Sequence, residues 1–202
     1  AGLNSISSGA IVLDGTHVQG ADPERAVVFQ SPNLMPWLTA RENVAIGADR
    51  VYPKASRAER QEVVEYYLEK VGLGDSMNRL AADMSNGMRQ RVGIARALVT
   101  NPDVLLMDEA FSALDPLIRI RLQDTVLALQ QRLGKTIVFI THDLDEALRL
   151  GNHIAILKDG ELVQEGEPED ILLAPATEYV QSFLQDVNRS KVLNAGHALQ
   201  EG

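Results

Sequence analysis

Three short apolar stretches of the chain each end in polar side chains that are suited to chemistry. Runs of this length, one of them preceded by Asn101 and Pro102, predict strands of a buried parallel sheet. The carboxyl ends of parallel strands meet at one edge, where open α/β folds bind ligands. The stretches are residues 25–29, ending in Gln30; residues 104–107, ending in Asp108 and Glu109; and residues 136–140, leading to Thr141 and His142. We expect these polar side chains to converge on one point.

Between the first two strands the apolar spacing is that of helices alone. In the stretch 57–71, side chains such as Leu68 fall on a buried face and charged ones such as Arg60 on an exposed face. The predicted helices are residues 40–48, 57–71 and 88–98, with a short helical piece within 72–82. This pattern predicts an α/β fold in which a helical subdomain, at about 31–100, is inserted into a parallel sheet core.

Local signals mark the elements of the second half. Pro116 begins a long helix that continues to Leu133 and is closed by Gly134. Asp159 and Gly160 predict a tight hairpin turn between strands at 153–157 and 161–164. Short helices are predicted at 168–173 and 177–187, so we expect the domain to span residues 1–187 and a frayed polar tail to span 188–202.

Composition excludes several classes of function. The 202 residues suit one domain with a real core, and the formal charge of −9 argues against nucleic acid as a partner. A local basic cluster remains at Arg89, Arg91 and Arg96, and its simpler explanation is a solvated helix face. The absence of cysteine excludes disulfides and thiol chemistry. No apolar run approaches the roughly 18 residues of a membrane span, so a connection to a membrane requires a partner.

Asp108 and Glu109 suit metal-assisted chemistry on a phosphate. One carboxylate at a strand end can hold Mg²⁺ directly or through water, and the next can polarise an attacking water. Taken alone, the pair can equally be two solvated acids. Upstream, Ser85 is predicted to cap a helix whose free N–H groups favour an anion, although Ser85-Asn86-Gly87 alone can be a simple helix cap.

The order of these motifs resembles an ABC-type ATPase over about residues 1–187. The motifs are the signature-like Ser85-Asn86-Gly87-Met88, the Walker B-like run 104–107 with Asp108-Glu109, the D-loop-like Ser112-Ala113-Leu114-Asp115, and the H-loop-like His142. The signature differs from the family's Leu-Ser-Gly-Gly-Gln at Met84, Asn86 and Met88, and Asn tolerates positive φ. The resemblance implies a P-loop NTPase-like core that uses ATP and Mg²⁺.

The resemblance also implies a role for each site residue. Glu109 and His142 would be catalytic, with His142 contacting the γ-phosphate and steadying the attacking water. Asp108 and Gln30 would serve Mg²⁺, and Gln30 would also reach the nucleotide and that water. Ser85, Asn86, Gly87 and Met88 would bind the nucleotide held by the opposite monomer, and Asp115 would communicate between the two nucleotide sites. Taken alone, Gln30 can be a polar strand cap and His142 a polar terminus.

The family's phosphate loop, G-x-x-x-x-G-K-[ST], does not occur in the sequence. Residues 1–3 and 8–15 resemble the segment that follows this loop in the family. We therefore expect an N-terminally incomplete copy that lacks the P-loop strand and its lysine, and that by itself binds ATP poorly and hydrolyses it negligibly. The missing strand is expected beside the strand 104–107, which would leave an open backbone edge there.

An apolar loop around Trp37 indicates the partners. Residues 31–40, with Pro32 and Pro36, resemble the patch that receives a coupling helix from a transmembrane permease subunit, although the loop can also pack on its own domain. The resemblance implies a homodimer or a pair with another ATPase subunit, a solute-binding protein as an indirect partner, and a peripheral place on the cytoplasmic face of the inner membrane.

The transported substrate stays open. The first half, with residues 34–44, looks like ATPases of nitrate, cyanate and sulfonate importers, towards which we lean. The second half, with residues 105–119 and 141–172, looks like those of glycine betaine and proline importers. Two other classes remain: a soluble non-transport ABC ATPase, disfavoured by the acidic charge and the Trp37 loop, and a catalytically dead fragment without the Walker A lysine.

Overall fold

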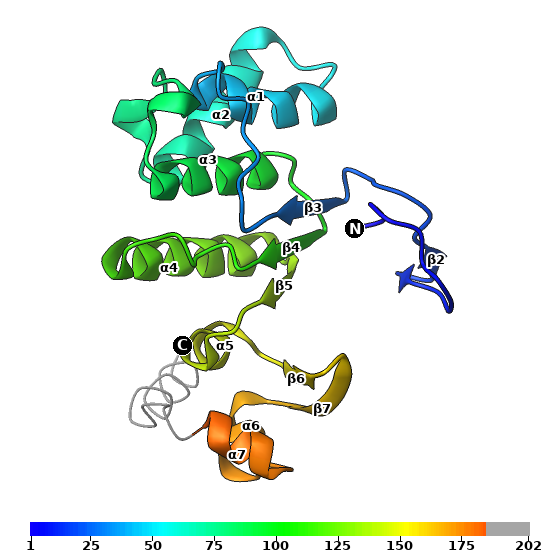
Figure 1. Cartoon of the computed structure of the whole chain (residues 1–202). Helices are drawn as coiled ribbons and strands as arrows, with labels where there is room; N and C mark the ends of the chain where they lie inside the picture. Colours follow the sequence, from blue (N-terminus) through cyan, green and yellow to red (C-terminus); the bar gives the residue numbers. More distant parts are fainter. Residues whose placement is uncertain (185–202) are drawn as a thin grey trace. The chain divides into compact units, whose positions relative to one another are not determined.

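The computed structural model describes residues 1–184, which fall into two units, residues 1–140 and the part that begins at Thr141 (Figure 1). Each unit is described by itself. The expected tail at 188–202, and the last residues of the helix predicted at 177–187, lie outside the described residues.

A parallel sheet of three strands carries the first unit. The strands are β3 (Arg25–Val28), β4 (Val104–Asp108) and β5 (Thr136–Ile140), in the order β3-β4-β5. Val28 pairs with Met107, and Asp108 pairs with Ile140, so all three strands end at the same edge. The predicted parallel sheet is therefore confirmed, and its carboxyl edge presents the residues that follow each strand.

The expected open edge beside β4 is wrong. β4 is hydrogen-bonded to β3 on one side and to β5 on the other, so a further strand could pair only with an outer strand. On β5, Val138 and Ile140 are 45% and 59% exposed. Strand order depends on pairing between segments far apart in the chain. The residues of an apolar strand do not indicate which other strand it pairs with.

Helices α1 (Ala40–Val51), α2 (Arg57–Lys70) and α3 (Asn86–Leu98) lie together in the first unit (Figure 1). The short 3-10 helices η1 (Gly74–Ser76) and η2 (Ala81–Asp83) connect α2 to α3. Capping boxes begin α1 and α2, because Thr39 and Ser56 each exchange hydrogen bonds with the glutamate three residues later. The predicted helices are confirmed with shifted ends; for example, α3 begins at Asn86, two residues before the predicted start.

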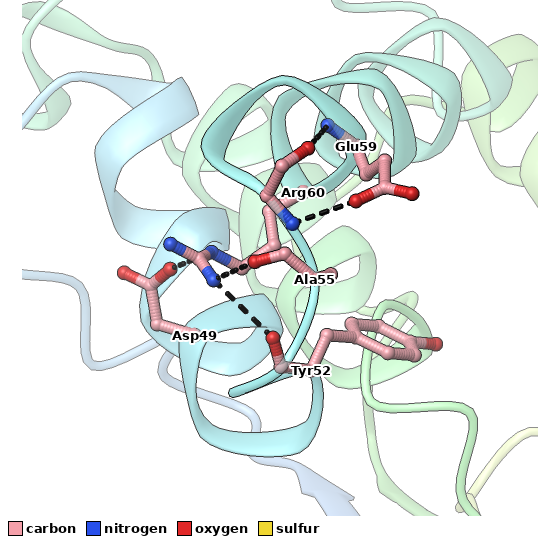
Figure 2. A network of polar contacts seen from close by, with 6 residues as sticks. Asp49, Tyr52, Ala55, Glu59 and Arg60 are labelled. Carbon is pink, nitrogen blue, oxygen red and sulfur yellow. Dashed lines mark hydrogen bonds and ion pairs between the residues drawn. The ribbon is translucent and has the colours of Figure 1, made fainter.

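Arg60 joins the end of α1 to the start of α2. Figure 2 shows its guanidinium between the carboxylate of Asp49, at 2.8 Å, and the carbonyl oxygens of Tyr52 and Ala55, at 3.3 and 2.5 Å. The sequence placed Arg60 on a solvated face, but the side chain is half-buried and fixes the connection between the two helices. A pattern of charges does not reveal such local bonds to backbone carbonyls.

Helix α4 (Pro116–Leu133) follows β4 and has the predicted bounds. Asp115 is its N-cap, Pro116 is in its first turn, and Gly134 ends it in the left-handed region at φ 62°. The N-terminal hairpin of β1 (Val12–Leu13) and β2 (Thr16–His17) also belongs to this unit.

Up to residue 184, the second unit is built on a hairpin and three helices. Strands β6 (Ile154–Lys158) and β7 (Glu161–Gly166) pair antiparallel around Asp159 and Gly160, which both have positive φ, as the Asp-Gly turn predicts. The helices are α5 (Leu144–Leu150), α6 (Pro168–Leu173) and α7 (Glu178–Phe183). Their apolar side chains, with those of β6, form one buried cluster. Within the described residues, no helix has the length and apolar character of a membrane span.

Candidate functional site

Gln30 and Glu109 meet at the carboxyl edge of the sheet. Gln30 follows β3 and Glu109 follows β4, and the two residues are 79 positions apart in the chain. The side-chain nitrogen Nε2 of Gln30 donates a hydrogen bond to Oε2 of Glu109 at 2.6 Å. The amide of Gln30 is exposed and the carboxylate of Glu109 is half-buried, so a ligand approaching this edge can reach both.

The backbone of Glu109 is held in an unusual conformation. Its φ is 45°, a region that costs a non-glycine residue about 1–3 kcal/mol unless the surroundings fix it. Here the N–H of Glu109 donates to the carbonyl oxygen of Ile140 at 2.9 Å, and its own carbonyl accepts from the N–H and hydroxyl of Ser112. The hydrogen bonds to Ile140 and Ser112 therefore fix the backbone from which the Glu109 side chain extends.

Asp108, the last residue of β4, lies directly before Glu109 and is half-buried. Among residues 1–184, no group of three or more His, Cys, Asp or Glu side chains could hold a metal ion alone. This donor set still fits Mg²⁺ bound to a nucleotide, because that ion commonly takes one or two protein oxygens and completes its shell with phosphates and water. Asp108 and the side-chain oxygen of Gln30 could supply protein oxygens for this ion, beside the carboxylate of Glu109.

The loop of residues 85–88 opens α3 and packs on the stretch before Asp115. The hydroxyl of Ser85 accepts from the N–H of Met88 at 3.3 Å, which confirms Ser85 as the N-cap. Asn86 begins the helix without positive φ, so its replacement of a glycine needs no left-handed backbone. A Cβ on Gly87 would lie 3.4 Å from Leu114, an ordinary van der Waals distance, so Gly87 lies beside the stretch that leads to Asp115.

Asp115 and His142 each stand at the start of a helix. The carboxylate of Asp115 accepts from the N–H of Ile118 at 3.1 Å and caps α4, a structural role that the motif alone did not indicate. His142 is exposed and immediately precedes Asp143, the N-cap of α5. His142 belongs to the second unit, so its convergence with Gln30 and Glu109 stays a prediction.

The arginines of α3 are not a solvated face, which corrects the sequence interpretation. Arg89 donates to the carbonyl oxygen of Met84 at 2.6 Å and to the side chain of Asn86. Arg91 donates to two carbonyls at the end of α2, and Arg96 to two carbonyls in residues 32–33. Burial lowers the pKa of Arg91 and of Arg96 below the ordinary value. These arginines therefore connect α3 to three other segments.

Gln90 is a further residue that the sequence reasoning missed. It is fully buried, and its Nε2 donates to the carbonyl oxygen of Phe29, next to Gln30, at 3.0 Å. The available signal was a glutamine four residues before Ile94, at a helical spacing where the pattern requires an apolar side chain.

Residues 1–112 of the chain match the protein family described as ABC transporter. The chain belongs to the ABC transporter family. The fold agrees with this family. Two solved dimeric structures of the ATP-binding cassette MJ0796, described as a bacterial ABC transporter cassette, superpose on this chain with a TM-score of 0.76 at 33% identity. The match covers 82% of this ABC chain and 76% of those chains, one of them in a post-hydrolysis state bound to ADP and Pi.

Curated relatives of the chain are proteins of several transport systems. The chain is 46% identical to the glycine betaine/carnitine transport protein GbuA of Listeria monocytogenes, over 96% of this chain and 50% of GbuA. It is 51% identical to the glycine betaine/proline betaine protein ProV of Escherichia coli, over 84% of this chain and 42% of ProV. It is 45% identical to the nitrate transport protein NasD of Klebsiella oxytoca, over 86% of this chain and 66% of NasD. The chain thus spans about half the length of the first of these relatives.

Proposed function

We propose that this protein is the ATP-binding, energy-coupling subunit of an importer, which hydrolyses ATP to drive the uptake of a small solute. The observation that carries the proposal is the 2.6 Å hydrogen bond between Gln30 and Glu109 beside Asp108. A carboxylate and an amide fixed together at the carboxyl edge of a parallel sheet are suited to orienting a water for attack on a phosphate.

In this proposal the residues of the edge divide the work. Glu109 accepts the proton of the attacking water, and Gln30 keeps the carboxylate turned towards that water. Because the nitrogen of Gln30 is bonded to Glu109, its side-chain oxygen would be the atom available to hold Mg²⁺, together with Asp108. When bound, Mg²⁺ would supply charge neutralisation for the phosphates. His142 contacts the γ-phosphate, a role that requires the second unit to bring it to this edge.

The proposed active form contains two copies. Ser85, Asn86, Gly87 and Met88 of one copy bind the γ-phosphate of the nucleotide held by the other, and Asp115 lies between the two sites. The free N–H groups at the start of α3, a helix of 13 residues, support anion binding. The dimeric cassette MJ0796 supports the pairing. We take residues 1–187 as the ATPase domain and 31–100 as its helical subdomain.

The Trp37 loop, residues 35–39, is the proposed contact with the permease subunit. Trp37 is 69% exposed, and Met35 and Leu80 beside the loop are 40% and 41% exposed. The side chain of Asn43 bonds to Met35, Leu38 and Thr39, which fixes the loop with Trp37 facing outwards. An apolar surface of this kind favours a protein partner over packing within the domain. The subunit would then act on the cytoplasmic face of the membrane, with a solute-binding protein as indirect partner.

The proposed solute is of the glycine betaine type or the nitrate type. GbuA, ProV and NasD support these two classes by similarities of 45–51%. Uptake of labelled glycine betaine and of nitrate by cells with and without the protein distinguishes them. The class whose uptake disappears with the protein is the substrate.

A substitution of Glu109 tests the proposed reaction. We expect Glu109→Gln to lower phosphate release from ATP by at least about a hundredfold, because the amide cannot accept the water's proton. Binding of ATP should persist, since the amide retains the size and most of the polarity of the carboxylate. The measurement is steady-state phosphate release by a protein that carries a phosphate loop ahead of residue 1 and is assembled with its permease, because the chain by itself is expected to be nearly inactive. Glu62→Gln, on the exposed face of α2, is the control. Unchanged turnover in Glu109→Gln would refute the proposal.

A further inference from the structure

Helix α3 holds the stretch around Gln30 by its backbone. We call residues 29–33 the Gln30 segment. Nε2 of Gln90 donates to the carbonyl oxygen of Phe29 at 3.0 Å. The guanidinium of Arg96 donates to the carbonyl oxygens of Pro32 and Asn33 at 2.7 and 3.1 Å. Gln30 therefore lies between two points at which α3 fixes the main chain.

A glycine brings the Gln30 segment close to the helix. Gly93 lies halfway between Gln90 and Arg96, so the three residues occupy successive turns on one side of α3. A Cβ on Gly93 would lie 3.2 Å from the Cβ of Pro32. A larger side chain there would move the segment away from both donors.

Packing alone does not account for Gln90. The residue is fully buried, and among the described residues its Oε1 has no hydrogen-bond partner. A buried amide oxygen without a partner destabilises a protein, whereas methionine fills a similar volume with no such group. We therefore expect the hydrogen bond from Nε2 of Gln90 to the carbonyl oxygen of Phe29 to serve a function.

We propose that Gln90 and Arg96 are positioning residues, which hold Gln30 against Glu109 and so couple α3 to the catalytic carboxylate. The inference rests on the proposed function. The 85–88 loop begins the same helix, and Arg89 ties the start of that helix to Met84 and Asn86. Binding at the loop therefore shifts one continuous helix. Because that helix holds the Gln30 segment on both sides of Gln30, the shift changes the Gln30–Glu109 bond.

The test compares three variants of α3. Gln90→Met removes the hydrogen bond to the carbonyl of Phe29, and Arg96→Met removes the hydrogen bonds to the carbonyls of Pro32 and Asn33. Arg91→Met is the matched control, because Arg91 also donates to two backbone carbonyls, at 3.1 and 2.9 Å, but these belong to Val71 and Gly72. Burial lowers the pKa of both Arg91 and Arg96, so the two variants remove similarly desolvated charges.

The first readout is the side-chain amide resonance of Gln30, identified by its loss in Gln30→Ala. In the parent, one amide proton should be shifted downfield by its bond to Glu109. We expect that proton to move to the position of a solvent-exposed glutamine in Gln90→Met and in Arg96→Met, and to stay in place in Arg91→Met. An unchanged proton in both test variants, or an equal change in the control, would overturn the inference.

The second readout is ATP hydrolysis. We expect kcat to fall about tenfold to a hundredfold in Gln90→Met and Arg96→Met with KM for ATP unchanged, because misplacement of a reacting group affects the chemical step. Arg96→Lys, which keeps one donor, should recover part of the loss. This readout needs a protein that carries a phosphate loop ahead of residue 1, because the chain by itself is expected to hydrolyse ATP negligibly. If that protein does not hydrolyse ATP, the proposed function fails while the resonance still decides the positioning role. If kcat falls in Gln90→Met and Arg96→Met by no more than in Arg91→Met, the positioning role is contradicted.

Discussion

The Trp37 loop and the Gln30 segment follow one another in the chain, and each is fixed by one buried amide side chain. Both polar atoms of the Asn43 amide are hydrogen-bonded to the Trp37 loop. Its Oδ1 accepts from the N–H of Met35 at 2.8 Å, and its Nδ2 donates to carbonyls of the loop. In Gln90 only the side-chain nitrogen is hydrogen-bonded to the Gln30 segment. Its buried side-chain oxygen has no partner within the described residues.

The difference teaches how the two stretches are used. A fully satisfied buried amide rigidifies the backbone that it contacts and adds to stability. A half-satisfied amide adds little, because the desolvation of its unpaired oxygen offsets the bond that its nitrogen makes. We therefore interpret the Trp37 loop as a fixed surface for a partner and the Gln30 segment as the stretch whose position the reaction uses.

Removal of the two amides should affect stability very differently. We expect Asn43→Ala to lower the free energy of unfolding by about 2–4 kcal/mol, since it removes a buried side chain and leaves part-buried N–H and C=O groups of the loop without their partner. Gln90→Met should lower it by less than about 1 kcal/mol, because the lost bond is offset by removal of the unpaired oxygen. Urea unfolding at pH 7 measures both. Equal losses would break the comparison.

A smaller effect is expected at the end of the Trp37 loop, where Glu42 bonds to Thr39. The backbone N–H of Thr39, and then its hydroxyl, lower the pKa of Glu42 below its ordinary value of 4.5. A carboxyl whose pKa is lower in the folded state contributes stability above the unfolded pKa, and this contribution is lost as the pH falls from about 4.5 through the folded pKa.

Glu42→Gln should therefore reduce stability at pH 7 and show a smaller loss between pH 7 and pH 3 than the parent protein. Urea unfolding at the two pH values measures this difference. Glu62→Gln, which changes an exposed carboxyl on α2, is the control. A parent and a Glu42→Gln variant with the same loss on acidification would show that the cap does not contribute.

Local signals were enough to predict much of the fold. Helix α4 has the predicted bounds because Pro116 and Gly134 mark its two ends within the chain itself. The rule that parallel strands end at one edge also brought Gln30 and Glu109 together correctly, although they are 79 residues apart. The strand order could not be predicted, because it depends on pairing that no apolar run encodes.

The roles of the α3 side chains could not be predicted for a related reason. Gln90 and Arg96 bond to backbone carbonyls 61 and 64 residues earlier in the chain. Every residue type has such a carbonyl, so the sequence of the acceptor carries no signal. The interpretation of Arg91 and Arg96 as a solvated face failed because it considered only possible side-chain partners and the solvent.

The central claim is that Gln30 and Glu109 act on the terminal phosphate as one unit. A double-mutant cycle of Gln30→Ala and Glu109→Gln tests it most directly, with phosphate release from ATP measured in a protein that carries a phosphate loop ahead of residue 1. We predict that Gln30→Ala lowers kcat about tenfold or more when Glu109 is present. In a protein that already carries Glu109→Gln, the same change should alter kcat by less than about threefold. Losses that multiply in the double variant would contradict the claim, because the two side chains would then act independently.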